Sequence, residues 1–441
     1  MARIVVVGAG IAGAAAAYAL RAHTVTVVDG AASVGGKLRT SPFAGASYDE
    51  GAEQFLVRTP EVLELVAALG LDAQVVHPDA SRAAVWSRGS LHPLPARTVL
   101  GVPSSVQSLL GLLTISEVMR AAADLAMPGK PPRSDVAVGA YLRRRLGDAV
   151  IDRLVDPLLG GVYAGRADEL SLFATMPAMR AEGSAIRSAR VAVGAADGGP
   201  VFATLTGGLG QLPPAALSAS GAHVVTGRMV RRIERTALGF RVVHGPTVDE
   251  QAMEADAVIV AVPAAPAARL LADVAPAAAA DLAAIEYASV AIVSLAYADP
   301  LPGEFTGFLV PAVEGRAVKA ATFSSLKWSH VEGAIVRCSI GRAGEVELLQ
   351  RPDEELISLA AADISAMTGL PAPVESRVTR WGGGLPQYAV GHVDRVARIR
   401  AAVALVPGLA VCGAAYDGLG VPACIRSAYA AADAVTSSIA Q

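Results

Sequence analysis

The chain begins with RIVVVGAGIAG (residues 3–13), a run of β-branched side chains that breaks into glycines. Such an apolar run is typical of a buried parallel strand that ends in a tight turn. Residues 14–21 are rich in good helix formers, and TVTVV (residues 24–28) predicts a second strand that ends at Asp29. The glycines therefore stand between a strand and a helix in a βαβ unit, with an acidic residue about twenty positions further on.

This glycine motif has the physical features of a dinucleotide site. Its glycines permit, in order, the tight turn, the approach of the backbone to a pyrophosphate, and the close packing of helix on strand. The N-terminus of the helix offers free N–H groups and a partial positive charge to the phosphates. Asp29 can accept hydrogen bonds from ribose hydroxyls, and both FAD and NAD fit this pattern. The contacts predicted from this unit come from Gly8, Gly10, Ile11, Ala12, Gly13 and Asp29.

A second glycine motif, GGK (residues 35–37), follows Asp29 after a short gap. This motif distinguishes between FAD and NAD as the cofactor. In many flavoproteins such a loop folds over the pyrophosphate and turns backbone N–H groups and a basic side chain toward it. The motif is rare in NAD enzymes, so it favours FAD. The stretch DEGAEQFL (residues 49–56) then fits a loop that returns to the cofactor. Together these loops predict FAD contacts from Gly35, Gly36, Lys37, Gly51, Ala52 and Glu53.

The composition of the 441-residue chain limits the classes of protein it can represent. Its length suits two or three domains of about 150 residues each. A net charge of −3 gives no reason to expect a nucleic-acid partner, and the 7 histidines and 3 cysteines show no metal-ligand spacing. The cysteines suggest no disulfide framework, and no signal peptide fits before the strand that starts at Arg3. We therefore expect a cytoplasmic protein without a metal site.

Residues 98–116 are uncharged and need a separate interpretation. Gly101, Pro103 and several serines make this stretch too polar and too interrupted for a membrane-spanning helix of about 20 apolar residues. We expect an ordinary core helix here. A helix lying on a membrane surface, or a wall of a substrate tunnel, is the alternative.

The rest of the chain alternates between strand-like and helix-like segments. Residues 83–95 predict a hairpin, residues 106–190 are mainly helical, and residues 202–263 return to strands. The chain closes with a strand, a glycine-rich turn that contains Asp417, and a helix. A closing unit of this kind can direct its helix dipole at a second group of the cofactor. The nucleotide-binding domain is therefore predicted to be discontinuous, with the C-terminal piece completing it.

Taken in order, these motifs resemble those of the bacterial FAD-dependent porphyrinogen oxidases, the family of coproporphyrinogen III oxidase and protoporphyrinogen oxidase. This family is part of the wider superfamily of monoamine oxidases and phytoene desaturases, which is also matched by residues 207–209 and 256–263. The more specific family motifs span nearly the whole chain. They are YDEGAEQF (48–55), PLLGGVYAG (157–165), LSLFATMP (170–177), LPQYAVGH (385–392) and GAAYDGLGVPACI (413–425).

The resemblance implies an α/β fold, α+β overall, in which a Rossmann-like FAD-binding domain is joined by a mixed-sheet substrate-binding domain and a helical insertion. The FAD-binding domain is expected at residues 1–75, 201–265 and 379–441. The substrate-binding domain is expected at residues 76–105 and 266–378, and the helical insertion at residues 106–200.

The resemblance also implies an activity. Relatives oxidise a porphyrinogen to a porphyrin by removing six electrons, with molecular oxygen as the acceptor and hydrogen peroxide as the product. The compact match and the alanine-rich composition resemble actinobacterial members, which favours coproporphyrinogen III over protoporphyrinogen IX as the substrate in heme biosynthesis. A ferrochelatase of the same pathway is an implied partner. Peripheral membrane contact is a further implication, because the helical insertion faces a membrane in some relatives.

The resemblance also carries expectations for single residues. Glu53 matches a position near the flavin edge, where it could orient or deprotonate a pyrrole N–H; a hydrogen bond to its own loop is the alternative. An anionic substrate needs basic partners, for which Arg82 is the first candidate and Arg58 and Lys327 are weaker ones. The backbone of Met229 and Val230 is expected to contact the adenine. The other expected FAD contacts are Val262, Gly413, Asp417, Gly420 and Val421.

Two other functions fit part of the sequence. A flavin amine oxidase or a carotenoid desaturase shares the superfamily motifs, but an amine oxidase usually presents an aromatic pair and a lysine to the flavin. Aromatic residues make up only 5% of this chain, and Lys319 is a poor match to that lysine. A binding protein that keeps the fold without redox chemistry is the second alternative, and the intact loops at both ends of the chain argue against it. The sequence carries no signal of subunit number.

Overall fold

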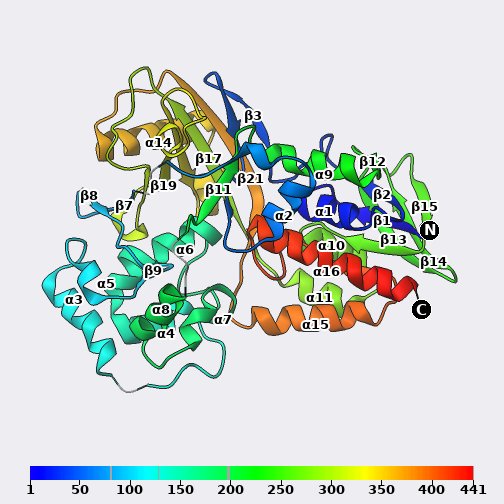
Figure 1. Cartoon of the computed structure of the whole chain (residues 1–441), viewed down its shortest axis with the longest axis horizontal. Helices are drawn as coiled ribbons and strands as arrows, with labels where there is room; N and C mark the ends of the chain where they lie inside the picture. Colours follow the sequence, from blue (N-terminus) through cyan, green and yellow to red (C-terminus); the bar gives the residue numbers. More distant parts are fainter. Residues whose placement is uncertain (80–81, 128, 196–198, 441) are drawn as a thin grey trace.

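The computed structural model describes residues 1–79, 82–127, 129–195 and 199–440. Its first layer is a five-stranded parallel sheet in the order β12-β2-β1-β16-β22 (Figure 1). The strands are β1 (Arg3–Val7), β2 (Thr24–Val28), β12 (His223–Val225), β16 (Ala257–Val260) and β22 (Leu409–Val411). Because β22 comes from the C-terminal part of the chain and pairs with β16, the sheet confirms the expected Rossmann-like architecture assembled from distant segments.

Both faces of this sheet are covered by other elements. Alternate side chains of β1 point to opposite faces and enter two different cores. Ile4 and Val6 pack in one core, and Val5 and Val7 pack in another. The first core contains α1 (Ile11–Ala19), α2 (Glu61–Ala68), α9 (Leu212–Ser220) and α16 (Val421–Ile439). The second contains α10 (Ala264–Leu271), α11 (Pro276–Ala283), α15 (His392–Ala404) and the antiparallel sheet of β13 (Val230–Thr236), β14 (Gly239–His244) and β15 (Gln251–Ala255).

The second layer is a seven-stranded mixed sheet in the order β21-β17-β20-β19-β18-β7-β8. Its strands are β7 (Ala83–Ser87), β8 (Ser90–Pro93), β17 (Tyr287–Ala296), β18 (Gly307–Leu309), β19 (Val318–Phe323), β20 (Ile335–Ile340) and β21 (Glu375–Pro386). Helix α14 (Asp353–Thr368) covers one face, where it packs on Val336 and Cys338 of β20. Strand alternation turns Arg337, which lies between them, to the opposite face of the sheet.

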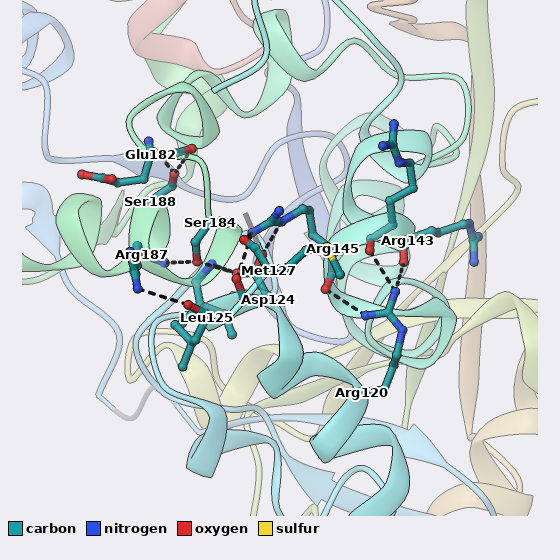
Figure 2. Close-up of polar contacts among 12 residues, drawn as sticks. Arg120, Asp124, Leu125, Met127, Arg143, Arg145, Glu182, Ser184, Arg187 and Ser188 are labelled. Carbon is teal, nitrogen blue, oxygen red and sulfur yellow. Dashed lines mark hydrogen bonds and ion pairs between the residues drawn. The ribbon is translucent and has the colours of Figure 1, made fainter. Parts of the chain in front are cut away.

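The helical region forms its own core, at the lower left of Figure 1. Its helices are α3 (Ile115–Ala122), α4 (Val138–Leu146), α5 (Asp148–Val150), α6 (Asp156–Tyr163), α7 (Leu172–Thr175) and α8 (Ala185–Gly194). Figure 2 shows the buried polar cluster that joins three of its segments. The carboxylate of Asp124 accepts hydrogen bonds from Nε of Arg145, from Oγ of Ser184 at 2.6 Å and from the backbone N–H of Ile186 at 2.9 Å. Asp124 thus satisfies an N–H group in the first turn of α8.

The expected helix over residues 98–116 is wrong, and so is the alternative of one helix lying along a membrane surface over this stretch. The stretch folds as the short strands β9 (Thr98–Val99) and β10 (Val102–Pro103) and a 3₁₀ turn at Val106–Leu109, and α3 begins only at Ile115. Gly101 between the strands has φ +88°, and a Cβ there would lie 2.9 Å from the backbone of Leu154. This close approach to the neighbouring helical segment requires a glycine, and a continuous helix cannot supply the positive φ.

Short elements connect the layers, and two of the predicted domain boundaries fall inside larger ones. The connecting elements are β3 (Thr40–Phe43), β4 (Ala46–Asp49), β5 (Phe55–Leu56), β6 (Val75–Val76), β11 (Phe202–Leu205), α12 (Ser324–Lys327) and α13 (Val346–Leu349). The boundary at 265/266 falls inside α10, which packs on the parallel sheet, and the boundary at 378/379 falls inside β21. We propose instead that the FAD-binding segment that begins at residue 201 ends at residue 286. The substrate-binding segment that follows it then ends at residue 386. The chain passes from one core to the other at these two positions.

Candidate active site

The first turn of the chain leaves no room for side chains at two of its glycines, Gly8 and Gly13. Gly8 has φ +106°, and a Cβ there would lie 2.7 Å from the carbonyl oxygen of Ala261 and 3.0 Å from Cγ1 of Val262. A Cβ at Gly13 would lie 1.8 Å from the carbonyl oxygen of Gly8. The backbone can therefore be this compact only with glycine at both positions, and α1 starts directly behind the turn at Ile11.

The second glycine motif lies on the first. Gly35 donates its N–H to the carbonyl oxygen of Ala9 at 2.9 Å, and a Cβ at Gly36 would lie 3.2 Å from Cα of Gly10. The third loop closes on the second, because a Cβ at Gly51 would lie 1.9 Å from the carbonyl oxygen of Lys37. The structure therefore brings all three predicted loops together, and the contact at Gly51 leaves no room for a side chain. Such a cradle of backbone at a helix N-terminus fits the pyrophosphate of FAD.

Lys37 is the basic residue of this cradle. Its Nζ lies 6.0 Å from the centroid of the Tyr287 ring, and burial lowers its pKa. The Cys424 thiol, in the first turn of α16, has its pKa raised by burial to about 11 and is influenced by the Lys37 charge. Lys37 therefore lies where the N-terminal loops meet α16, and a partly desolvated ammonium there suits a phosphate or flavin oxygen.

Asp29 and Met229 define the adenine end of the predicted site. Asp29 accepts hydrogen bonds from the N–H of Ala9 at 2.6 Å and of Ala31 at 2.7 Å, one on each carboxylate oxygen. Each oxygen keeps a lone pair for a ribose hydroxyl. A Cβ at Gly30 would lie 3.4 Å from Cβ of Met229, so the structure brings Met229 next to the end of β2, while Val230 is buried.

The C-terminal residues reach the same site through their backbone. Gly413 has φ +120°, and a Cβ there would lie 3.8 Å from Cβ of Ala12 in α1. Gly420 is the N-cap of α16, which starts at Val421. The Asp417 carboxylate is engaged in an ion pair with Arg400 of α15, and the cofactor contact expected at Asp417 stays a prediction.

A mostly buried ion pair joins two residues for which the sequence predicted different roles. Nζ of Lys327 lies 2.7 Å from Oε1 of Glu53, and Nη1 of Arg337 lies 3.9 Å from Oε2. Burial alone would raise the pKa of Glu53, but Lys327 and Arg337 outweigh it, and the pKa lies below its ordinary value. Glu53 is therefore ionised at neutral pH, and a carboxylate of lowered pKa is a weak general base. Glu53 is therefore suited to orient an N–H group, and it would hold a proton taken from that group only briefly.

Sequence reasoning missed Arg337. It donates hydrogen bonds to the carbonyl oxygens of Asp49 and Gly51, the former at 2.8 Å, and so ties the third loop to the substrate-side sheet. Its signal was a single arginine inside the apolar strand IVRCSI (residues 335–340), where alternation turns it away from the α14 core.

The other predicted substrate residues lie apart from this cluster. Arg58 and Arg82 are exposed, and within the part of the chain that the structure describes neither contacts Glu53 or Lys327. Their roles stay predictions. A cavity of about 240 Å³ lies beside β17 and β21. Tyr287 lines this cavity, and its ring centroid is 6.0 Å from Nζ of Lys37. Its charged lining residues are Arg342, Glu345 and Arg380.

The fold and the glycine cradle define an FAD-dependent oxidoreductase. Residues 11–436 match the family model described as flavin containing amine oxidoreductase. The chain therefore belongs to the flavin-containing amine oxidoreductase family.

Similar enzymes and solved structures give a more specific comparison than the family model. The coproporphyrinogen III oxidase of Mycobacterium tuberculosis is 40% identical over 98% of this chain and 96% of its own length. The enzyme of the same name from Bacillus subtilis is 30% identical over 98% of both chains. A crystal structure from Exiguobacterium sp. 255-15, provisionally assigned as a protoporphyrinogen oxidase, superposes with a TM-score of 0.88 at 30% identity and covers 100% of this chain and 99% of its own. A UDP-galactopyranose mutase, with a TM-score of 0.76 at 16% identity, shares the fold alone.

Proposed function

We propose that the protein oxidises coproporphyrinogen III to coproporphyrin III in heme biosynthesis. The observation that carries this proposal is the near full-length similarity to enzymes named coproporphyrinogen III oxidase, combined with a glycine cradle that fits FAD at each of its three loops. When bound, FAD supplies the acceptor for a hydride equivalent from the substrate. Molecular oxygen is the final acceptor in this proposal, and hydrogen peroxide is the product.

The protein contributes binding, orientation and exclusion of water. Glycine backbone holds the pyrophosphate, Asp29 holds the ribose, and Lys37 supplies positive charge beside the flavin end of the cradle. The ionised Glu53 accepts a hydrogen bond from a pyrrole N–H, and Lys327 and Arg337 fix the direction of its carboxylate. No strong base is required for this role.

The propionates of the substrate need cationic partners on the outer side of the site. We propose Arg82 and Arg58 for this role because both are exposed. Lys327 contributes indirectly, because its ammonium is already paired with Glu53. The cavity of about 240 Å³ beside Tyr287 offers part of the space that a tetrapyrrole needs, with Arg342 and Arg380 on its wall.

Protoporphyrinogen IX is the second candidate substrate. A chloroplastic protoporphyrinogen oxidase of Nicotiana tabacum is 25% identical over 99% of this chain, and the Exiguobacterium structure carries the same provisional assignment. The two substrates differ by two propionates in place of two vinyl groups, so the charge of the outer pocket separates them. We propose that Arg82 and Arg58 favour the more anionic coproporphyrinogen III.

Competition between the two porphyrinogens tests the proposal. Purified protein loaded with FAD is mixed with equal amounts of both in air, and the products are resolved by mass. Coproporphyrin III is expected to form first. Added catalase is expected to convert the hydrogen peroxide to oxygen and water, and so to return part of the oxygen that was consumed. Preferential formation of protoporphyrin IX would establish the second candidate instead. Failure of both oxidations with bound, reducible FAD would overturn the proposal.

The cellular setting is also a proposal. We infer that the protein works in the cytoplasm, passes its product to a ferrochelatase and touches the membrane peripherally. No helix within the described residues is long and apolar enough to cross a membrane. The support for peripheral contact is a group of exposed apolar residues at the start of the helical region, namely Leu110, Ile115 and Met119.

A further inference from the structure

A small polar cavity lies directly beside Glu53. The cavity is bounded by the end of β4 and the loop that follows it, by β11, and by α12 with the loop after it. The cavity volume open to the centre of a water molecule is about 20 Å³. This volume holds about one ordered water. Its lining residues are Ser47, Tyr48, Asp49, Glu53, Thr204, Gly208, Ser324, Trp328, His330 and Val331.

Four of these residues have a buried polar atom without a hydrogen-bond partner among the described residues. They are Thr204 (Oγ1), Ser324 (Oγ), Trp328 (Nε1) and His330 (Nδ1). The side chains of the first three belong to residues that are only 2–3% exposed. Unpaired buried polar atoms are costly, so four around one cavity indicate a site built for a polar occupant.

The chemistry of these atoms selects the occupant. The indole N–H of Trp328 can only donate, so the occupant must accept a hydrogen bond. The carboxylates of Asp49 and Glu53 can only accept when ionised, so the occupant must also donate. Water is the molecule of this size that does both, and buried water typically makes about three such bonds.

Two lining residues relate the cavity to its surroundings. The Glu53 side chain is 15% exposed and lies in the loop that packs on the flavin cradle. His330 is half-buried and follows the exposed Ser329. The ring of His330 lies 6.2 Å from that of Trp328, so the cavity connects a residue of the site with a histidine that reaches the surface.

We propose that ordered water in this cavity, together with His330, carries protons between Glu53 and solvent. The inference rests on the proposed function, because a closed porphyrinogen site must release protons. In each of the three two-electron steps a meso C–H bond loses a hydride equivalent and the ring loses one proton. Two of these three protons come from N–H bonds, and the third comes from the fourth meso carbon after a proton shift between carbon and nitrogen. The electron pair of each broken N–H bond stays in the ring as part of a new C=N bond. Reduction of oxygen to hydrogen peroxide takes up two protons for every two electrons, so the proton released from the ring is balanced by the acceptor.

The charges around the route are compatible with it. Asp49 lines the cavity from the end of β4, and Glu53 lines it from the loop that follows. Lys327 and His330 come from α12 and the loop behind it, and Arg337 comes from β20. The hydroxyl of Tyr48, which lines the cavity, and the carboxylate of Asp79, which influences His330, are further titratable groups beside the route. Burial lowers the pKa of His330, and so its ring is mostly neutral at pH 7 and can take up a proton. The lowered pKa of Glu53 means that it holds a proton only briefly.

Chemical rescue tests the proposal. In the FAD-loaded enzyme, His330→Ala is expected to lower the rate of porphyrin formation at least about tenfold at low buffer concentration, because a proton-transfer group is lost. Imidazole, which can occupy the space of the missing ring, is expected to restore most of that rate and to reduce the solvent deuterium isotope effect. His223→Ala, at the exposed start of β12, is the matched control and is expected to show neither effect.

A second variant gives a readout that does not depend on activity. Trp328→Phe keeps the aromatic packing and removes only the indole N–H. A crystal structure of the parent holoenzyme is expected to show water bonded to Trp328, Thr204 and Ser324, and the variant structure is expected to lose it. An unchanged rate in His330→Ala, a loss of rate that imidazole does not restore, or a dry cavity in the parent would each overturn the route. A parent enzyme that oxidises no porphyrinogen, with water present in the cavity, would instead overturn the proposed function and the role of the route in it.

Discussion

Glu53 and Lys327 form an ion pair with an N–O distance of 2.7 Å although they lie 274 positions apart in the chain. Glu53 belongs to the loop that packs on the FAD cradle, and Lys327 ends α12, between two strands of the seven-stranded sheet. Both side chains are only 15% exposed. The pair therefore connects the loop beside the FAD cradle with the seven-stranded sheet, and it joins two residues for which the sequence predicted separate roles.

A double-mutant cycle measures this connection. Glu53→Gln and Lys327→Met are each expected to cost about 1–3 kcal/mol of unfolding free energy, because each leaves a mostly buried charge without its partner. The double variant is expected to lose less than the sum of the two, with a coupling of about 1–2 kcal/mol. Denaturant unfolding of the four proteins gives these values. Strict additivity would show that the two side chains act independently.

The contribution of Asp49 to the unfolding free energy changes with pH in the opposite direction to that of a salt-bridged acid. Burial raises the pKa of Asp49 to about 6, whereas the unfolded chain has its ordinary value of 3.8. The folded state then binds more protons between these values, so this group's contribution to stability is fully present below about pH 4 and is lost as the pH rises through about 6. We expect Asp49→Asn to remove about 2 kcal/mol of this dependence between pH 4 and pH 7. Parallel slopes for the two proteins over that range would contradict the assignment.

The glycine cradle predicts a selective loss of cofactor. Gly36→Ala places a Cβ 3.2 Å from Cα of Gly10 at a residue with φ +59°, and so it strains the backbone and pushes the two loops slightly apart. We expect FAD affinity to fall at least about tenfold, or about 1.4 kcal/mol, in a flavin fluorescence titration. Gly194→Ala in α8 is the matched control, because nothing lies within 4 Å of its Cβ and the helix gains propensity. Equal FAD affinity in the two variants would place the pyrophosphate elsewhere.

The polar cluster of Figure 2 predicts a large stability effect far from the cofactor. Asp124→Ala removes the carboxylate that Arg145, Ser184 and the N–H of Ile186 share. We expect a loss of about 3–5 kcal/mol in denaturant unfolding, because the Arg145 side chain is 8% exposed and its charge loses this partner. Asp148→Ala is the control: its side chain is 78% exposed in a pair with Arg143, and its loss is expected to cost under about 1 kcal/mol. Similar values for both variants would contradict the account of this cluster.

The sequence predicted what local geometry dictates. The turn at Gly8 and Gly13 is visible because only glycine tolerates the contacts there, and the βαβ pattern around it extends over few residues. The role of β22 could be anticipated for the same reason, since a strand, a glycine turn and a helix recur at the C-terminus. These motifs were sufficient for the cofactor, the fold class and the family.

Other features depend on contacts between distant segments. The pairing of Glu53 with Lys327, and of Asp417 with Arg400, follows from how separate layers pack, which no local pattern encodes. The error at residues 98–116 has a related cause, since Gly101 is fixed by its contact with Leu154 rather than by its neighbours in sequence. Arg337 was visible only as an exception inside an apolar strand.

Anaerobic mixing of the FAD-loaded protein with coproporphyrinogen III tests the central claim most directly. The account predicts that the flavin absorbance bleaches on mixing, and that admission of air restores it while coproporphyrin III fluorescence grows. Flavin that dithionite bleaches but that neither coproporphyrinogen III nor protoporphyrinogen IX bleaches would contradict the claim.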